Sequence, residues 1–388
     1  MKQAHVNRRS FLQSSACAAA ITLENASPLS DVRQDRQPVA PDATRVLQIG
    51  IIGLGARSRE HVQLMKENNS ACHIAAICDV RDDRLEQTLM ACGGNPATYT
   101  DYRELLKHPG LDTIVIITPH HLHAPMSIDA LDAGYDVLVE KPMALNVAEC
   151  NQMNAAAHKN KRFLIVTEQH RHMAVNRKAK ELIDAGAIGT VLYLWVASFR
   201  HHWNMGKKWM NHLDLGGGLL VMESCHDLDA FYYILNSHIT RVAGFGGTAI
   251  YQNQDTLDHA LVIYEYENGV KLSYGFSTTA PGGYKQRVIF GTKGRLEYDR
   301  KDKTVYQYTY EVGGRDFSGP IEHDVSREMD EGGHPGTAEM YRDIIQSLRE
   351  RREAVTAGVG MVESVRVTTA GQDAIRLGTV INVREMTG

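Results

Sequence analysis

The sequence predicts an α/β protein with two domains, and three observations support this prediction. An apolar strand pattern at residues 45–52 runs into closely spaced glycines and then into a helical pattern. Unbroken β-branched runs such as residues 112–118 follow, which are typical of parallel strands covered on both faces. Alternating β-rich runs separated by turn signals then fill the second half of the chain. We therefore expect a parallel sheet with helices, followed by a domain built around a meander of strands.

The composition is that of an ordinary globular protein. The 388 residues are 43% hydrophobic and 23% charged, which is enough for two separate cores. The formal charge of −4 argues against a nucleic-acid surface, and no apolar run approaches the about 18 residues of a membrane helix. The six cysteines form no C-x-x-C pair. We expect no nucleic-acid partner and no membrane span in the mature protein.

The first 44 residues are expected to lie outside the fold. Residues 7–13, Asn-Arg-Arg-Ser-Phe-Leu-Gln, resemble a twin-arginine export signal, and residues 16–23 would be its short apolar region. An unstructured basic N-terminus is the alternative. Residues 24–44 have the composition of a flexible linker. The signal predicts an exported, periplasmic protein.

The glycines after the first strand match a dinucleotide fingerprint in two of its three places. Gly53 and Gly55 stand where G-x-G-x-x-G needs unusual backbone angles and a close approach to a pyrophosphate. Ser58 occupies the third place, which leaves the anion site at the helix N-terminus intact. The motif alone is weak, because a plain glycine turn has the same pattern.

An acid after the second strand strengthens this interpretation. Residues 72–78 form an apolar run that ends at Asp79, about where a βαβ unit hydrogen-bonds the adenosine ribose. Capping of the following helix is the alternative role of Asp79. A carboxylate there repels a 2′-phosphate, so NAD is favoured, although Arg81 keeps NADP open.

Two further strands complete the predicted parallel sheet. Residues 112–118 end at Pro119, and a helix is expected from about residue 122 to 133, with Gly134 as its stop. The next strand, from residue 135, ends in Glu140-Lys141-Pro142. Ligands bind at this carboxyl edge in open α/β sheets.

These motifs together resemble the Gfo/Idh/MocA oxidoreductases, the family of glucose-fructose oxidoreductase and inositol dehydrogenase. The resemblance covers nearly everything from residue 45 onward, and a series in this order is far more specific than any single motif. The matching segments are Gly53-Leu-Gly55, Thr118-Pro119 with His123, Ala133-Gly134, Glu140-Lys141-Pro142, residues 177–189, and Gly216-Gly-Gly218 followed by His226.

The resemblance implies a Rossmann domain at residues 45–165 and a substrate-binding α/β domain at residues 166–388 with a large, mainly antiparallel sheet. The sequence agrees, because β-rich runs occur at 190–200, 257–267, 270–278, 285–290 and 303–311. Helical patterns at 225–235 and 339–351 are expected to pack behind this sheet. By analogy, the protein is expected to be a homo-oligomer.

The family motifs also imply a set of ligand-binding residues. The dinucleotide would contact Gly53, Gly55, Ala56, Arg57, Asp79, Thr118, Pro119, His123, Glu140 and Lys141. The substrate would contact Lys141, Arg171, Trp203, Asp214 and His226.

Lys141 and His226 are the predicted catalytic residues. Hydride transfer from a carbinol carbon leaves a hydroxyl proton that an alcohol does not release unaided at neutral pH. Lys141, at a strand end, can stabilise the developing negative charge, whereas a surface ion pair with Glu140 is its alternative role. His226 matches the catalytic histidine of the family, and imidazole titrates in the required range.

One position departs from the family pattern. Many members have an aspartate four residues before the histidine, where this chain has Met222. Glu223, Asp214 or Asp227 could supply a carboxylate instead, and the sequence does not choose among them. Many further histidines crowd the predicted cleft, with His334 as an additional loop candidate, but none has the spacing of a metal motif. No catalytic metal is expected.

Export and cofactor together favour chemistry without net redox change. Free dinucleotide is scarce outside the cytoplasm, so the enzyme should fold around its NAD and hold it tightly. The first hypothesis is a sugar or cyclitol oxidoreductase that oxidises one substrate and reduces another. The second is an NAD-dependent glycoside hydrolase that oxidises C3 transiently and eliminates the aglycone. The third is a dinucleotide-bound sensor without catalysis, which only Met222 supports.

Overall fold

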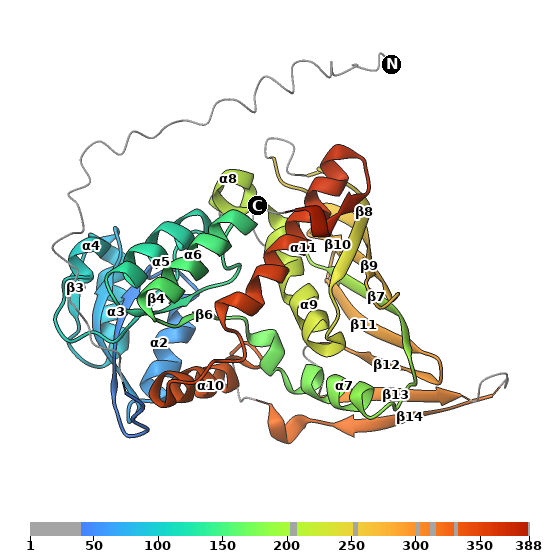
Figure 1. Ribbon diagram of the computed structural model, residues 1–388, viewed down its shortest axis with the longest axis horizontal. Coiled ribbons are helices and arrows are strands. Elements are labelled where there is room, and N and C mark those ends of the chain that lie inside the picture. Colours follow the sequence, from blue (N-terminus) through green and yellow to red (C-terminus); the bar gives the residue numbers. More distant parts are fainter. Residues whose placement is uncertain are drawn as a thin grey trace, which may run out of the picture.

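The computed structural model describes residues 40–201, 208–250, 255–299, 303–310, 316–329 and 333–386. Residues 1–39, which include the predicted export signal, and Trp203 lie outside the described residues. Within the described residues, two sheets organise the structure, one parallel with six strands and one mostly antiparallel with nine. They lie side by side with helices between them (Figure 1). The predicted α/β fold class is confirmed.

The parallel sheet has the strand order β3-β2-β1-β4-β5-β6. Its buried strands are the unbroken apolar runs of the sequence, and the reversal of order between β1 and β4 places their carboxyl ends beside the glycine turn. The strands are β1 (Leu47–Ile52), β2 (Cys72–Cys78), β3 (Ala97–Tyr99), β4 (Thr113–Ile116), β5 (Asp136–Val139) and β6 (Leu164–Val166). The helices that connect them are α2 (Ser58–Glu67), α3 (Asp82–Cys92), α4 (Tyr102–Leu105), α5 (His123–Asp132) and α6 (Val147–Asn160).

The second sheet has the order β14-β13-β12-β11-β7-β10-β9-β8-β15. All neighbouring strands are antiparallel except β7 and β10, which run parallel. Two meanders therefore flank β7, where the sequence predicted one. The strands are β7 (Val191–Phe199), β8 (Ile239–Gly247), β9 (His259–Tyr266), β10 (Lys271–Ser277), β11 (Tyr284–Gly291), β12 (Gly294–Tyr298), β13 (Thr304–Tyr310), β14 (Phe317–Asp324) and β15 (Ile381–Asn382).

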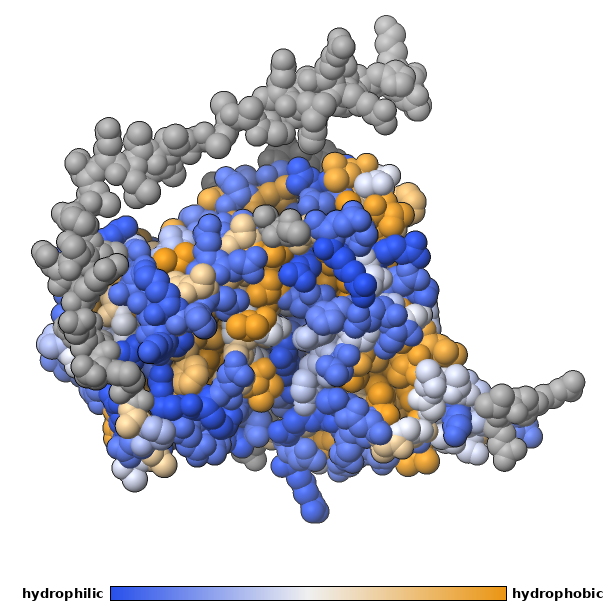
Figure 2. All heavy atoms as spheres, in the orientation of Figure 1, coloured by the Kyte–Doolittle hydropathy of each residue, from blue (hydrophilic) through white to orange (hydrophobic). Residues whose placement is uncertain are grey.

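The two faces of this sheet differ. Helices α7 (Ala174–Asp184), α9 (Leu219–Leu235) and the second half of α11 (Gly358–Leu377) bury one face in a common core. On the opposite face, Phe245, Leu261, Ile263 and Phe290 are between 37% and 85% exposed. Figure 2 shows hydrophobic residues gathered at the right of the visible face, over strands of this sheet.

Helix α10 (Thr337–Glu350) packs where the sequence did not predict it. Its apolar side, with Tyr341 and Ile344, joins the core of the parallel sheet and α2. In Figure 1 this helix lies beneath α2, away from the second sheet. The expectation that it packs behind the second sheet was wrong, because an amphipathic pattern predicts a buried face and not its partner. No helix in the described part of the chain is long and apolar enough to span a bilayer.

Candidate active site

The turn between β1 and α2 has the shape that a dinucleotide loop requires. Gly53 has φ +91°, and a Cβ there would lie 2.6 Å from the carbonyl oxygen of Ile117. Above Gly55, a Cβ would meet no heavy atom within 4 Å. The Ser58 hydroxyl donates to the carbonyl oxygen of Gly55 at 2.7 Å, so serine in the third place closes the turn. The turn, continued by Ala56 and Arg57, therefore has a packed side toward β4 and an open side suited to a pyrophosphate.

Asp79 lies beside this turn. One carboxylate oxygen accepts from the backbone N–H of Leu54 at 2.7 Å and the other from that of Arg81 at 3.0 Å. The Arg81 guanidinium is paired with Asp83 at 2.6 Å. The aspartate is thus held at the end of β2, where NAD recognition was predicted. Arg81 forms an ion pair with Asp83 and not with Asp79.

A charged cluster connects the turn with the end of β5. Glu140 accepts from Arg57 Nε at 2.7 Å and lies 2.9 Å from His61 Nε2. Burial opposes the charge of Glu140, but Arg57 and His61 hold its pKa well below the usual range. His334, just before α10, contacts Glu60 at 2.6 Å and Arg57 at 3.1 Å. Glu140 is therefore an ionised anchor for Arg57.

Thr118 and Pro119 lie in the loop after β4, and His123 is the first residue of α5. The two ring nitrogens of His123 lie 2.9 Å from the Pro142 carbonyl oxygen and 3.0 Å from that of Thr118. His123 thereby connects the loops after β4 and β5. His123 thus stabilises these two loops at the carboxyl edge of the parallel sheet. Its direct contact with a cofactor stays a prediction.

Lys141 extends from the end of β5 toward the second domain. Its Nζ donates to the carbonyl oxygen of Met222 at 3.3 Å, and its backbone N–H donates to Glu140 at 2.9 Å. Met222 is in α9, which begins at Leu219, directly after the glycine run. The helix is longer than the sequence predicted, so His226 lies within it and not at its start.

His226 is bonded to a carboxylate that the sequence analysis missed. Its Nδ1 lies 2.8 and 2.9 Å from the two oxygens of Glu168, just after β6. The rings of His226 and His170 stack with centroids 4.3 Å apart and planes 15° apart. Burial raises the pKa of Glu168 to about 7, although the His170 amide and Lys141 oppose this shift. The sequence contained a signal for Glu168, because an acidic residue closely follows an apolar strand there, as Asp79 does after β2.

Three carboxylates were considered as substitutes for the family aspartate that Met222 replaces, and each has a different environment. Glu223 is paired with Arg200 at 2.6 Å, and Asp214 is exposed on α8 (Leu213–Gly216). Asp227 is paired with Arg287, which lowers its pKa against the effect of burial, and accepts from the Tyr274 hydroxyl. The carboxylate that contacts His226 is that of Glu168.

Arg171 is part of the packing around the site. In η4 (Gln169–His172), its guanidinium donates to both oxygens of Asp229 at 2.7 and 2.8 Å and to two backbone carbonyls. It thereby joins η4 to α9 and to the start of α11. Its predicted substrate contact has no support in this arrangement and stays a prediction.

Two groups of described residues have potential metal ligand atoms within 4.8 Å of one another. Glu168, His170 and His226 form a buried group. The exposed group comprises His212, Asp214 and Asp255. The expectation that catalysis needs no metal stays a prediction.

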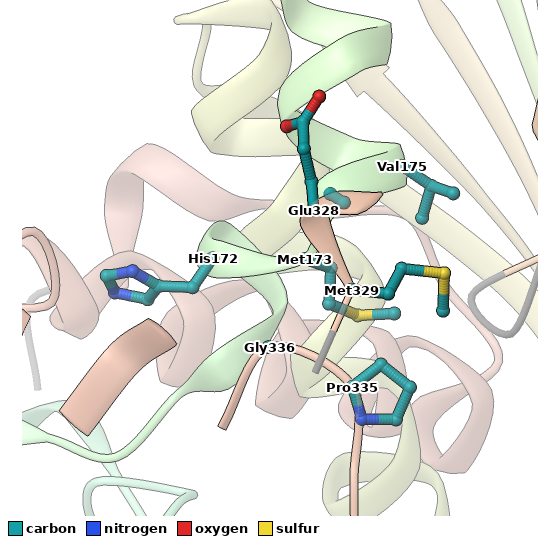
Figure 3. Close-up of a pocket in the computed structure, with 8 residues that line it drawn as sticks. His172, Met173, Val175, Glu328, Met329, Pro335 and Gly336 are labelled. Atoms are coloured by element: carbon teal, nitrogen blue, oxygen red, sulfur yellow. The ribbon is translucent and has the colours of Figure 1, made fainter. Parts of the chain in front are cut away.

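A small pocket lies apart from this cluster. It is lined by residues from the end of η4, the start of α7 and the segment before α10, including Met173, Met329 and Pro335. Figure 3 shows the two thioethers near Pro335, whereas the His172 ring points away from them. Lys141, Glu168 and His226 do not line it. The pocket is thus a packing gap beside α10.

The parallel sheet, its glycine turn and the family models that match the chain define the class of protein as an NAD(P)-dependent oxidoreductase. Residues 47–168 match the family model described as an oxidoreductase family with an NAD-binding Rossmann fold. Residues 176–297 match the model of the GFO/IDH/MocA C-terminal domain. The chain belongs to the Gfo/Idh/MocA family.

Similar proteins cover most of the chain. Myo-inositol 2-dehydrogenase of Thermotoga maritima is 28% identical over 69% of this chain and 80% of its own. The structure of levoglucosan dehydrogenase in complex with NADH has a TM-score of 0.76 at 20% identity, covering 87% of this chain and 99% of the other. The structure of aldose-aldose oxidoreductase from Caulobacter crescentus has a TM-score of 0.74 at 22% identity, covering 87% and 100%. The two structures share the fold.

Proposed function

We propose that this protein transfers hydride between a tightly bound nicotinamide cofactor and a carbinol carbon of a sugar or cyclitol. The observation that carries the proposal is the arrangement of Lys141 and His226. An ammonium group at the carboxyl edge of the parallel sheet donates to the helix that carries a buried imidazole. Names of similar proteins, inositol and levoglucosan dehydrogenases among them, support this substrate class.

The cofactor, when bound, supplies the hydride acceptor or donor. Gly53 and Gly55 would admit its pyrophosphate, and Asp79 would accept from its ribose hydroxyls, which favours NAD over NADP. Lys141 would hydrogen-bond the reacting hydroxyl and stabilise negative charge on its oxygen. His226 would exchange the proton of that hydroxyl. With Lys141 and His226 in these roles, the substrate itself needs no charged group.

Tight binding and export belong together in this proposal. Residues 7–13 resemble a twin-arginine signal, and this route carries folded proteins with their cofactors in place. A periplasmic enzyme would then regenerate its NAD by reducing a second substrate. The name aldose-aldose oxidoreductase of a structural neighbour is compatible with such chemistry.

The exposed face of the second sheet supports a homo-oligomer. Phe245 pairs with Leu261 across strands, and Ile263 shares this face, so contiguous apolar side chains face outward. Such a face is typical of a protein–protein interface. A second copy of the chain is the proposed occupant.

The test uses protein purified without added cofactor. Myo-inositol, levoglucosan, glucose and fructose are added singly, and the fluorescence of bound NADH is followed. We expect at least one polyol to raise this fluorescence and a second sugar to reverse it. Release of nitrophenol from nitrophenyl glycosides without added NAD would instead favour the glycoside hydrolase, and no response from any substrate would favour the sensor.

A further inference from the structure

A buried carboxyl group approaches His226 from the end of the parallel sheet. Glu168 follows β6 of the parallel sheet and has no exposed surface, whereas His226 lies in α9 of the second domain. Both carboxylate oxygens are within 2.9 Å of Nδ1 of His226. One of them also accepts from the backbone N–H of His170 at 3.0 Å. The carboxylate is therefore fixed from its own side of the interface.

We propose that Glu168 is the positioning residue of this active site. Its carboxylate holds the proton of His226 on Nδ1, which makes Nε2 the nitrogen that exchanges a proton with the substrate hydroxyl. Its negative charge also stabilises the imidazolium that forms when His226 accepts this proton. This inference rests on the proposed hydride-transfer function and assigns a residue to it.

The position of Met222 explains why the carboxylate comes from elsewhere. Met222 occupies the place of the family aspartate but has a thioether, which is at best a weak acceptor. Its backbone carbonyl instead accepts from Lys141. The carboxylate that bonds to the imidazole comes instead from Glu168, after β6. Orientation of the histidine then depends on the contact between α9 and the segment after β6.

The surroundings of Glu168 compensate its negative charge. Burial disfavours a lone carboxylate, but the backbone N–H of His170 and the positive charge of Lys141 stabilise it. Parallel stacking of His170 on the His226 ring fixes the plane of the imidazole. The charged or titratable groups that act on Glu168 or bond to it include Glu140, Lys141, His170, Arg171, Cys225, His226 and Asp229.

A metal ion is the competing occupant of the same residues. Glu168, His170 and His226 are a carboxylate and two imidazoles, a set that divalent transition metals accept. The positive charge of Lys141 acts on Glu168 and would repel a divalent cation. The local charges therefore favour the hydrogen-bonded pair of Glu168 and His226 over a metal ion.

The kinetic test compares Glu168→Gln with a matched variant. Glu363→Gln removes another buried carboxylate, in α11, which lies 3.4 Å from a ring nitrogen of His238. With the polyol found in the fluorescence panel, we expect Glu168→Gln to lower kcat by about 100-fold and to change KM by less than about threefold. Its pH profile should lose the step near neutrality, Glu168→Asp should restore part of kcat, and Glu363→Gln should behave as wild type.

A second measurement does not need turnover. Nitrogen-15 NMR of histidine-labelled protein, with His226→Gln to assign the signal, should show a proton on Nδ1 of His226 in the wild type and an altered signal in Glu168→Gln. A wild-type proton on Nε2, or equal kinetics of Glu168→Gln and Glu363→Gln, would overturn the proposal. The proposal would also be overturned if natively purified wild-type protein contained about one zinc or manganese ion per chain and Glu168→Gln protein contained none. If no substrate responds, the proposed function fails, and the NMR signal alone decides on Glu168.

Discussion

At the scale of single residues, Lys141 has the most demanding role. Replacing it with alanine removes the positive charge at the end of β5 that would stabilise the reacting oxygen. We expect Lys141→Ala to lower kcat by about 100- to 1,000-fold while the protein still binds NAD. Steady-state kinetics and NAD titration measure the two effects. Lys159→Ala, which removes an exposed ion pair with Asp132, is the control, and retention of most turnover by Lys141→Ala would refute its role.

The two motif glycines should separate folding from binding. Gly53→Ala places a Cβ 2.6 Å from the Ile117 carbonyl oxygen at a positive φ, so we expect a clear fall in Tm. Gly55→Ala meets no protein atom within 4 Å, so Tm should stay close to wild type. Its methyl group would instead occupy the space of the pyrophosphate and weaken NAD binding. Thermal unfolding and NAD titration on both variants check this contrast, and unimpaired NAD binding by Gly55→Ala would contradict it.

Residue-scale prediction from sequence succeeded where the signal is local. Gly53, Asp79 and Lys141 follow directly from strand ends and glycine spacing, so their placement at one sheet edge could be predicted. Glu168 could not be paired with His226, because 58 residues separate them in the sequence. The hydrogen bonds of Arg171 were hidden for the same reason, since Asp229 is equally distant in sequence.

At the scale of elements, helix α10 links distant parts of the chain. Tyr341 contacts His61 in α2, and Ile344 is buried in the core of the parallel sheet. We expect Ile344→Ala to lower the free energy of unfolding by about 2–5 kcal/mol. Chemical denaturation measures this change, with exposed Gln346→Ala as the control. An equal, small effect of both variants would show that α10 does not contribute to this core.

Strands and helices were predictable to different degrees. The buried strands of the parallel sheet are unbroken apolar runs, and β2 matches its predicted bounds. In the second sheet, β7 lies between β10 and β11, and no local pattern encodes such an order. The first turns of α9 were missed because Leu219-Leu-Val-Met222 is apolar on every side, and a helix buried all round lacks the amphipathic period.

At the scale of the whole molecule, helix α11 joins the two cores. Its first half packs on the parallel sheet through Met361 and Val365, and its second half packs on the second sheet through Ala370 and Ala374. With α10, it returns the C-terminal part of the chain to the first domain. Residues of α10 and α11, which follow the predicted boundary near residue 165, complete the core of the first domain. The boundary itself stays a prediction.

The outer face of the second sheet should decide the oligomeric state. Leu261→Lys places a charge in the middle of the exposed apolar strip beside Phe245. We expect this variant to shift the protein toward monomers, because a buried lysine without a partner is costly. Light scattering after size exclusion measures the mass. Val80→Lys, at an exposed site of the first domain, is the control, and an unchanged oligomer in Leu261→Lys would exclude this face as the interface.

Native mass spectrometry of the protein, purified without added cofactor, tests most directly whether a dinucleotide is held at the sheet edge that carries Lys141. We expect each chain to carry the additional mass of one NAD or NADH, and Gly55→Ala to lack it. A wild-type chain of bare polypeptide mass that also takes up no dinucleotide when NAD or NADP is added would contradict the account.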